Sequence, residues 1–248
     1  MLFFFKKNIK NKNEKLKILS AYNFRYRKVG EKSEKNIIKY ANYFNFDYEF
    51  QKKNKFERPF NWLKIKMLID CLQNESHEYY LWLDADAFFC RYENILNHID
   101  KSKHIHVHNN FFKSSHKTKY KNVDYLTWAP NSGVLLVKNT KWSLKFFKNI
   151  WNKKKYINHY WTDNAAFMEE IGLKTEIGKI ADNNISKEVK NKVSFLSGIW
   201  NSMPKRNYKN PENNELSNFY FDPVIIHLAG IRRSDRLKFI REYKNLFI

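Results

Sequence analysis

The sequence predicts an α/β fold in a single domain, with a mainly parallel central sheet flanked by helices. Short apolar segments of strand length alternate along the chain with segments whose apolar residues recur at helical spacing. No linker rich in Gly, Pro or Ser interrupts the 248 residues, and no internal repeat is present. Apolar residues make up 43% of the chain, which is enough to bury a sizeable core.

Seven segments are predicted to be strands. The segment 16–22 is a short apolar run, and 79–83 is predicted to be a buried strand. Phe46, Tyr48 and Phe50 alternate with other residues, which is the period of a strand. The predicted strands are residues 16–22, 46–50, 79–83, 104–107, 132–138, 193–195 and 224–227.

Helices are predicted between these strands. Apolar residues recur at helical spacing in 34–44, and Gly172 is well placed to end a helix at 163–171. The polar stretches 109–121 and 200–218 are predicted to be loops, the first of them flexible. The predicted helices are residues 34–44, 60–72, 140–151, 163–171 and 236–246, with a short helical turn at 95–99.

The chain is strongly basic, with 46 Lys and Arg against 25 Asp and Glu, a formal charge of 46 − 25 = +21. Such a charge fits a solvated Lys-rich surface, contact with an anionic membrane leaflet or acidic glycolipid, or nucleic acid. The lysines are spread along the chain rather than concentrated in one stripe, which argues against nucleic acid. A basic surface also attracts small anionic ligands.

Cysteine usage and the start of the chain indicate the compartment. Cys71 and Cys90 form no CxxC pair, so a thiolate zinc site is not supported and a reducing compartment is indicated. Residues 1–15 are predicted to be a flexible or interfacial lead-in. Their apolar start is too short to span a bilayer and lacks the basic-then-apolar order of a secretory signal. We therefore expect a cytoplasmic protein, with peripheral contact to the inner face of the membrane as a further option.

Two carboxylates, Asp84 and Asp86, follow the buried strand 79–83 within nearly continuous apolar sequence. Unpaired buried charge is costly, so a cation, basic side chains or exposure at the strand end must compensate them. Carboxylate ligands suit Mg²⁺ or Mn²⁺, and open α/β sheets bind ligands at the carboxyl ends of their strands. The alternative is that the two aspartates cap a turn or pair with lysines.

The segment Asp84-Ala85-Asp86 resembles the DxD signature of the GT-A glycosyltransferases, and other segments follow in the order of that group. They resemble the galactosyl/xylosyltransferase family related to the yeast Golgi mannan α-galactosyltransferases, over roughly residues 16–235. The resemblance implies a GT-A type, Rossmann-like domain over 16–248. The matching segments are 20–23, Arg58-Pro59 with Trp62 and Lys64, Asn131-Ser132-Gly133 with the strand that follows, Trp142-Ser143, Asp163-Asn164 to Phe167, and His227-Leu228-Ala229-Gly230.

The resemblance implies a metal site and a donor site. Asp86 would bind a Mn²⁺ or Mg²⁺ ion directly, Asp84 would reach the ion through water or contact the donor ribose, and His227 would be the third protein ligand. Gly230 would let the backbone approach the diphosphate. Arg232 or Arg233 would neutralise it, and Arg233 stands where related HxxGxxK motifs have Lys.

Further residues are assigned to the donor and to catalysis. The resemblance implies that the transferred sugar contacts Asn131, Ser132 and Gly133, and that Trp200 and Asn201 touch donor sugar or acceptor. Asp163 and Asn164 are the expected catalytic pair, although Asp163 is equally suited to capping a helix. Relatives often carry Gln-Asp or Asp-Gln at this pair. The remaining expected donor contacts are Ala21, Tyr22, which would stack on the base, and Lys64.

The function that the resemblance implies is transfer of a hexose, with galactose favoured, from a UDP-sugar to a glycan or glycolipid, with retention of configuration. No nucleic-acid partner is expected. Two alternatives stay open at this stage: a basic nucleic-acid-binding protein, and a GT-A-like glycan-binding domain without turnover. The alternating histidines His104, His106 and His108 also suggest zinc, but same-face residues on a strand lie roughly 6–7 Å apart, too far for easy chelation of one ion.

Overall fold

A computed structural model of the chain describes residues 16–248 apart from 53–54, 75, 115–124, 174–185 and 205–218. The lead-in predicted at 1–15 lies outside the described residues, as do parts of the two predicted polar loops. In the described part of the chain, no helix is long and apolar enough to cross a membrane.

The central sheet has six strands in the order β2-β1-β3-β6-β5-β7. Three of its five pairings, β1 with β2, β1 with β3 and β5 with β7, are parallel. The other two are antiparallel, because β6 runs against both of its neighbours. The α/β prediction is therefore confirmed, with a mixed sheet. The strands are β1 (Leu16–Tyr22), β2 (Asp47–Lys52), β3 (Tyr79–Leu83), β5 (Ile105–Ser114), β6 (Tyr125–Lys138) and β7 (Val193–Leu196).

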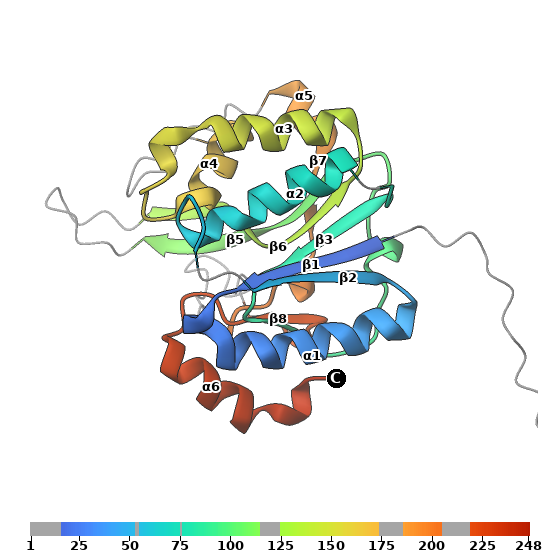
Figure 1. Cartoon of the computed structure of the whole chain (residues 1–248), viewed down its shortest axis with the longest axis vertical. Coiled ribbons are helices and arrows are strands. Elements are labelled where there is room, and N and C mark those ends of the chain that lie inside the picture. The colour runs from blue at the N-terminus through green and yellow to red at the C-terminus, as the bar shows by residue number, and fades with distance from the viewer. Residues whose placement is uncertain (1–15, 53–54, 75, 115–124, 174–185, 205–218) are drawn as a thin grey trace, which may run out of the picture.

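Helices cover both faces of this sheet, so the molecule is layered (Figure 1). On one side lie α2, α3 and α4, and on the other side α1 and α6 (Figure 1). Local signals fix their ends: the Thr140 side chain caps α3, and Gly172, at φ 95°, ends α4 as predicted. The helices are α1 (Arg27–Phe44), α2 (Leu63–Asn74), α3 (Lys141–Asn152), α4 (Thr162–Glu170), α5 (Lys187–Lys192) and α6 (Arg233–Glu242).

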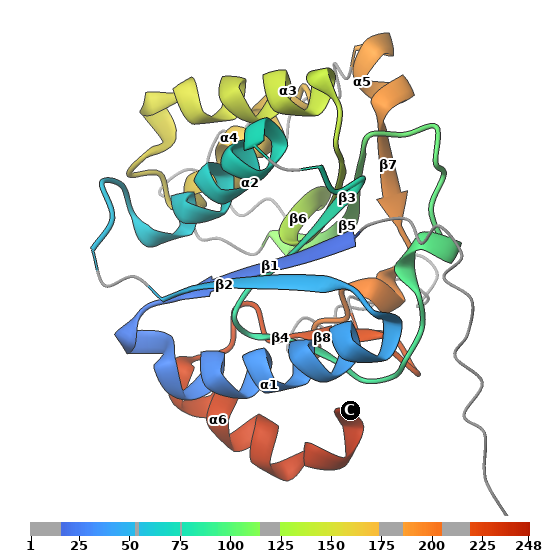
Figure 2. The same cartoon turned by 45° about the vertical axis from the view of Figure 1, so that its right-hand side comes forward.

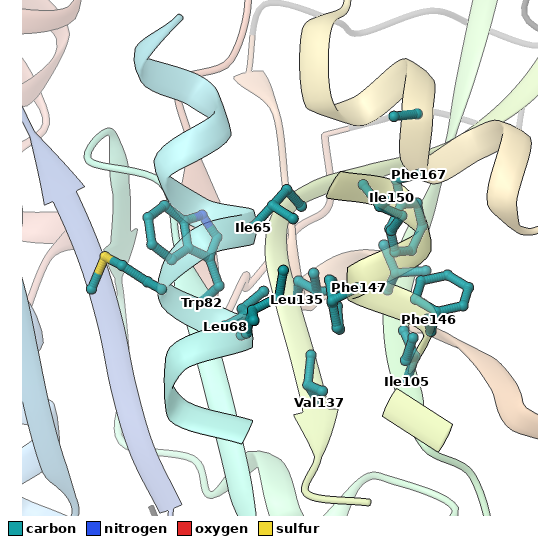
Figure 3. Close-up of a cluster of buried hydrophobic side chains, with 14 of the residues drawn as sticks. Ile65, Leu68, Trp82, Ile105, Leu135, Val137, Phe146, Phe147, Ile150 and Phe167 are labelled. Atoms are coloured by element: carbon teal, nitrogen blue, oxygen red, sulfur yellow. The ribbon is translucent and has the colours of Figure 1, made fainter. Parts of the chain in front are cut away.

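The sheet separates two hydrophobic cores. Strand β3 is buried at all five positions because its side chains alternate between them: Tyr80 and Trp82 enter one core, and Tyr79, Leu81 and Leu83 enter the other. Figure 3 shows the first core, where side chains of α2, β6, α3 and α4 meet. Burial on both faces explains why the sequence of β3 is an apolar run rather than an alternating one.

A second, two-stranded sheet lies below the main sheet, beside α1 (Figure 2). It pairs β4 (Ala87–Phe89) with β8 (Ile225–His227) in antiparallel fashion, and Ala87 stands opposite His227. Asn36 of α1 fastens β4, because its Nδ2 donates to Phe89 O at 2.9 Å and its Oδ1 accepts from Phe89 N–H at 2.7 Å. This small sheet joins segments that are far apart in sequence.

Several predicted boundaries differ from the structure. Helix α1 begins at Arg27, earlier than predicted, because its first turns are mostly polar and show little apolar periodicity. The flexible loop predicted from Asn109 is wrong as far as Ser114, since residues 109–114, which do not alternate apolar with polar, continue β5 by pairing with β6. Strand β4 and helix α5 were not predicted, as both are short.

Replacing Asn36 with Leu tests how α1 holds β4. The substitution leaves the buried N–H and C=O of Phe89 without these partners, so we expect the free energy of unfolding to fall by about 2–4 kcal/mol. Urea denaturation followed by circular dichroism measures it. Asn42→Leu, on an exposed position of the same helix, is the control and should change stability by less than about 0.5 kcal/mol. Equal effects of the two substitutions would contradict this role.

Candidate functional site

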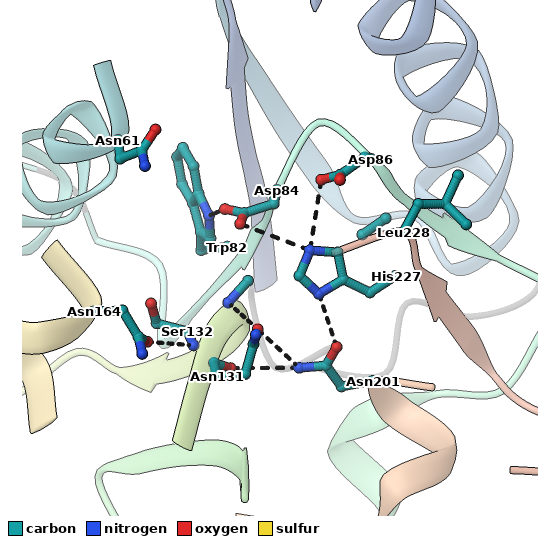
Figure 4. Close-up of polar contacts among 12 residues, drawn as sticks. Asn61, Trp82, Asp84, Asp86, Asn131, Ser132, Asn164, Asn201, His227 and Leu228 are labelled. Atoms are coloured by element: carbon teal, nitrogen blue, oxygen red, sulfur yellow. Dashed lines mark hydrogen bonds and ion pairs between the residues drawn. The ribbon is translucent and has the colours of Figure 1, made fainter. Parts of the chain in front are cut away.

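The two carboxylates Asp84 and Asp86 lie in the turn that connects β3 to β4. The Asp84 N–H donates to Gly133 O at 2.8 Å, and the Ala87 N–H donates to Asp84 O at 2.9 Å, so the chain reverses tightly at the end of β3. Figure 4 shows both side chains pointing from this turn toward His227. The turn therefore places the two carboxylates at the carboxyl end of a central strand, as the sequence indicated.

His227 completes a group that is suited to a metal ion. Its Nε2 lies 3.8 Å from Asp84 Oδ2 and 3.5 Å from Asp86 Oδ1. One ligand atom from each of the three residues lies within 4.8 Å of the others, and in the described part of the chain this is the one such cluster of His, Cys, Asp or Glu. The β4–β8 pairing explains the meeting, because it sets His227 opposite the residue after Asp86.

Asn201 fixes the direction of the imidazole. Its Oδ1 lies 2.9 Å from His227 Nδ1, while its Nδ2 donates to Asn131 O at 3.4 Å and to Asn131 Oδ1 at 3.3 Å. Because the amide nitrogen of Asn201 faces Asn131, its oxygen faces His227 and accepts the Nδ1 proton. The lone pair of Nε2 is then directed at the two carboxylates (Figure 4), which is the orientation that a metal-binding histidine needs.

Protein groups hold the other oxygen of each carboxylate. Trp82 Nε1–H donates to Asp84 Oδ1 at 2.7 Å, and Arg236 Nε lies 3.1 Å from Asp86 Oδ2. The two oxygens that face His227 are the ones these groups leave open. Burial opposes ionisation of Asp86, but a proton on His227 Nε2, present when no ion is bound, and the positive charge of Arg236 outweigh burial and lower the pKa of this carboxyl below its ordinary value. Asp86 is thus ionised and ready to bind a cation.

Lys64 links the acidic turn to helix α4. Its Nζ lies 3.4 Å from Asp84 Oδ1, 3.0 Å from Asp163 Oδ2 and 3.0 Å from Ser132 Oγ, and the residue is only 4% exposed. Burial works against the charge of Lys64, but Asp163 and Asp84 outweigh it and raise the pKa of the amine. Lys64 therefore stays protonated and bridges the two carboxylates.

The start of α4 is held by side chains on both sides. Thr162 has φ 41°, an unusual value for a β-branched residue, and its Oγ1 donates to Asp163 Oδ1 at 2.9 Å. Asn164 accepts from Ser132 N–H at 3.0 Å and donates to Pro130 O at 3.1 Å. Asp163 is thus engaged with Lys64 and Thr162 rather than capping the helix, and Asn164 ties α4 to strand β6.

A bulge in β6 makes room for the site. Val107 of β5 pairs with Leu135, but the next residue, His108, pairs with Asn131, so residues 132–134 are looped out of this pairing. A Cβ added at Gly133 would lie 2.1 Å from His227 Cε1 and 2.9 Å from Asp84 Oδ2. Glycine is required there because no other residue leaves space for the histidine.

A cavity of about 330 Å³ opens beside the cluster. The expected site residues Trp200, Asn201 and Arg233 do not line it. Trp200 is 1% exposed and packs in the core, and Asn201 lies behind His227. Arg233 is exposed, and its Nη1 donates to Arg25 O at 3.0 Å. The other expected residues do line the cavity: Ala21, Tyr22, Lys64, Asp84, Asp86, Asn131, Ser132, Gly133, Asp163, Asn164, His227 and Gly230.

Tyr22 lines the cavity but is largely buried. Its ring packs against Gly30, and its hydroxyl donates to Glu34, so little of the ring is free to stack on a base. Tyr26, which sequence reasoning missed, also lines the cavity and is 37% exposed. It belongs to a short helical turn whose position no apolar pattern in the sequence indicated.

Two groups that hold the carboxylates were also missed. Trp82 stands two residues before Asp84 on the same strand, so the period of a strand could have indicated that they share a face. Arg236 comes nine residues after His227, in a helix that was predicted to begin at residue 236 but begins at Arg233, and no local signal pointed to its role. The histidine row of β5 is not part of the cluster: His106 and His108 are buried, and His108 Nδ1 bonds to Leu196 O at 3.1 Å.

Asn201→Ala tests the orientation of His227. Loss of the amide frees the imidazole to rotate, and we expect the affinity of the folded variant for Mn²⁺ to fall by about ten- to a hundredfold. Titration calorimetry of the free protein measures the affinity. Asn191→Ala, at an exposed site, should leave it within about twofold of the wild type. An unchanged affinity in Asn201→Ala would refute the orienting role.

Gly133→Ala tests the space that the bulge provides. The new methyl group would overlap His227, so the ring must move away from the carboxylates, and we expect Mn²⁺ affinity to drop at least about tenfold. The same titration reports the result, and far-ultraviolet circular dichroism checks that the fold persists. Wild-type affinity in a folded Gly133→Ala protein would show that His227 is not a ligand.

Solved structures with the same architecture are glycosyltransferases. One, a glycosyltransferase involved in the glycosylation of the major capsid of PBCV-1, has a TM-score of 0.62 and 16% identity, over 92% of this chain and 99% of that chain. The galactosyltransferase LgtC, solved with donor and acceptor sugar analogues, has a TM-score of 0.56 and 12% identity, over 91% of this chain and 95% of that one. No protein-family model and no curated protein sequence matches the chain.

The relation to the yeast Golgi mannan α-galactosyltransferases stays a prediction. The likeness in three dimensions shows that the chain has the GT-A fold.

Proposed function

We propose that the protein is a metal-dependent glycosyltransferase that transfers a hexose from a UDP-sugar to a glycan or glycolipid, with retention of configuration. The observation that carries this proposal is the convergence of Asp84 Oδ2, Asp86 Oδ1 and His227 Nε2 at the wall of the cavity. Two carboxylates with one imidazole suit Mn²⁺, and Mg²⁺ is the alternative. The GT-A fold supports the same assignment.

The charges around the cavity fit an ion followed by an anionic donor. Asp84, Asp86 and Asp163 contribute three negative charges, and Lys64 and Arg236 contribute two positive ones. With His227 counted as neutral the sum is −1, so a divalent cation would bring it to +1. A site that becomes positive when its ion binds then attracts a diphosphate.

The donor is proposed to lie along the cavity with its diphosphate beside the ion. Gly230, at φ 74°, turns the backbone at the cavity wall and brings no side chain to block the phosphates. Ala21 and Tyr22, at the end of β1, are proposed to border the nucleoside. The transferred sugar is proposed to contact Asn131, Ser132 and Gly133. Lys64 lies at the same wall of the cavity, where its Nζ donates a hydrogen bond to Ser132 Oγ.

The reaction breaks the bond between the anomeric carbon and the diphosphate, and forms a bond from that carbon to an acceptor hydroxyl oxygen. When bound, the metal ion would stabilise the charge on the departing diphosphate. An inverting enzyme needs a free carboxylate to take the acceptor proton. Among the described residues that line the cavity, Asp84 and Asp86 are assigned to the ion, and Asp163 is engaged by an ion pair from Lys64 to its Oδ2 and a hydrogen bond from Thr162 to its Oδ1. The lack of a free carboxylate base among these residues favours retention. The departing diphosphate would then accept the proton of the acceptor hydroxyl on the same face of the sugar.

The sugar and the acceptor are proposed from the motif resemblance, the shared fold and the net charge. Galactose is favoured by the motif resemblance, and LgtC, which shares the fold, is a galactosyltransferase. A glycolipid at the inner face of an anionic membrane fits the net charge of +21. Vesicles with anionic lipid should then retain the protein at low salt and release it at high salt.

A donor screen with Asp86→Ala tests the central claim. We expect one nucleotide sugar of a UDP-sugar panel to be hydrolysed slowly in the presence of Mn²⁺, and Asp86→Ala to reduce the rate at least about a hundredfold because the ion loses a ligand. Product release measured by chromatography, with and without chelator, follows the reaction. Asp70→Ala removes a carboxylate that pairs with Lys66 away from the cavity, and it should keep the wild-type rate.

Two results would contradict the proposal. Hydrolysis that persists in chelator, or in Asp86→Ala, would exclude the metal mechanism. Binding of UDP-sugars without any turnover, with or without a range of acceptor glycans, would favour the alternative of a glycan-binding domain.

A further inference from the structure

Arg236 is a buried cation that the chemistry proposed above does not use. It lies one turn into α6, is 8% exposed, and borders the cavity. Its Nε–H donates to Leu228 O at 3.2 Å, and the same nitrogen forms an ion pair with Asp86 Oδ2 at 3.1 Å. One edge of the guanidinium is therefore fixed against the acidic turn and the strand end that carry two of the metal-site residues.

Its terminal nitrogens are free to bind a ligand. In the parts of the chain that the structure describes, neither Nη1 nor Nη2 makes a hydrogen bond, although the residue is largely buried. The guanidinium lies over the Tyr26 ring, with Cζ 5.2 Å from the ring centroid, and Tyr26 also lines the cavity. Stacking restricts rotation of the group, so its planar fork of N–H donors is held ready for phosphate oxygens.

Arg233, which the motif spacing selects, has a different position. It is the first residue of α6, is exposed, does not border the cavity, and bonds through Nη1 to Arg25 O. That bond ties α6 to the short helix before α1, which is a structural role. The basic residue at the cavity is thus found one helical turn beyond the position that the spacing indicates.

We propose that Arg236 binds the diphosphate of the donor, and that its bond to Asp86 couples diphosphate binding to the metal site. The inference rests on the proposed function. The same guanidinium contacts Asp86 through Nε, and Arg236 borders the cavity while its terminal nitrogens make no hydrogen bond to the described residues. It is therefore placed to position Asp86 and to contact a phosphate oxygen at the same time.

The test compares variants of the two arginines in the full-length protein. UDP is titrated by calorimetry in saturating Mn²⁺, and UMP serves as the probe that lacks the second phosphate. We expect Arg236→Lys and Arg236→Gln to weaken UDP binding at least tenfold and to weaken UMP binding less. Arg233→Gln, the matched control on the same helix, should stay within about twofold of the wild type.

Other outcomes separate this inference from the function on which it rests. Unchanged UDP affinity in Arg236→Lys, or a tenfold loss in Arg233→Gln alone, would overturn the role of Arg236. Equal losses for UDP and UMP would also overturn it, since they would place the effect outside the diphosphate. If the wild-type protein binds no nucleoside diphosphate with Mn²⁺, the proposed function fails and this inference with it. Melting temperatures confirm that each variant is folded, and Arg236→Lys keeps the charge that balances Asp86.

Discussion

Electrostatic repulsion between Asp84 and Asp86, held close together at the wall of the cavity, is the constraint that the rest of the site satisfies. Two like charges this near each other are costly unless opposite charges or donors compensate them. The chain compensates one oxygen of each carboxylate, through Trp82 and Arg236, and directs the other toward His227 Nε2. Half of each carboxylate is thus satisfied by protein and half is left for an ion. This division gives the site a defined geometry before any ligand arrives.

Two features of the backbone and one side chain bring these groups together. The β4–β8 pairing carries His227 to the acidic turn, the bulge of β6 leaves space for its ring, and Asn201 sets the tautomer that exposes Nε2. Lys64 then extends the network to Asp163 at the start of α4. These features come from different parts of the chain, and the side chains around them come from helices on both faces of the sheet. The site therefore depends on the packed tertiary fold (Figures 1 and 4).

The sequence was informative where burial imposes a pattern. The bounds of β1 and β3 were predicted correctly, and α2 nearly so, because core residues must be apolar at regular spacing. The sequence did not predict the part of β5 beyond Val107. The residues there do not alternate between apolar and polar, so their backbone pairing with β6 leaves no strand pattern in the sequence. In the site, the three residues of the candidate metal cluster could be predicted from the order of motifs. Arg236, which holds Asp86, could not, because it reaches the cluster only through the tertiary fold.

The contrast between His227 and Arg233 shows when motif spacing can be trusted. His227 belongs to a paired strand, opposite Ala87, so its direction is fixed by the hydrogen bonds of the ladder. Arg233 follows the turn at Gly230, where φ is 74°, and begins a new helix. The direction of a side chain there depends on where the helix starts, and a shift of one residue rotates it by about 100°. Spacing therefore gives the position of a residue along the chain but not the side of the helix on which it lies. In this protein the cation at the cavity comes from the next turn, where the fold of α6 against Leu228 and Tyr26 holds it.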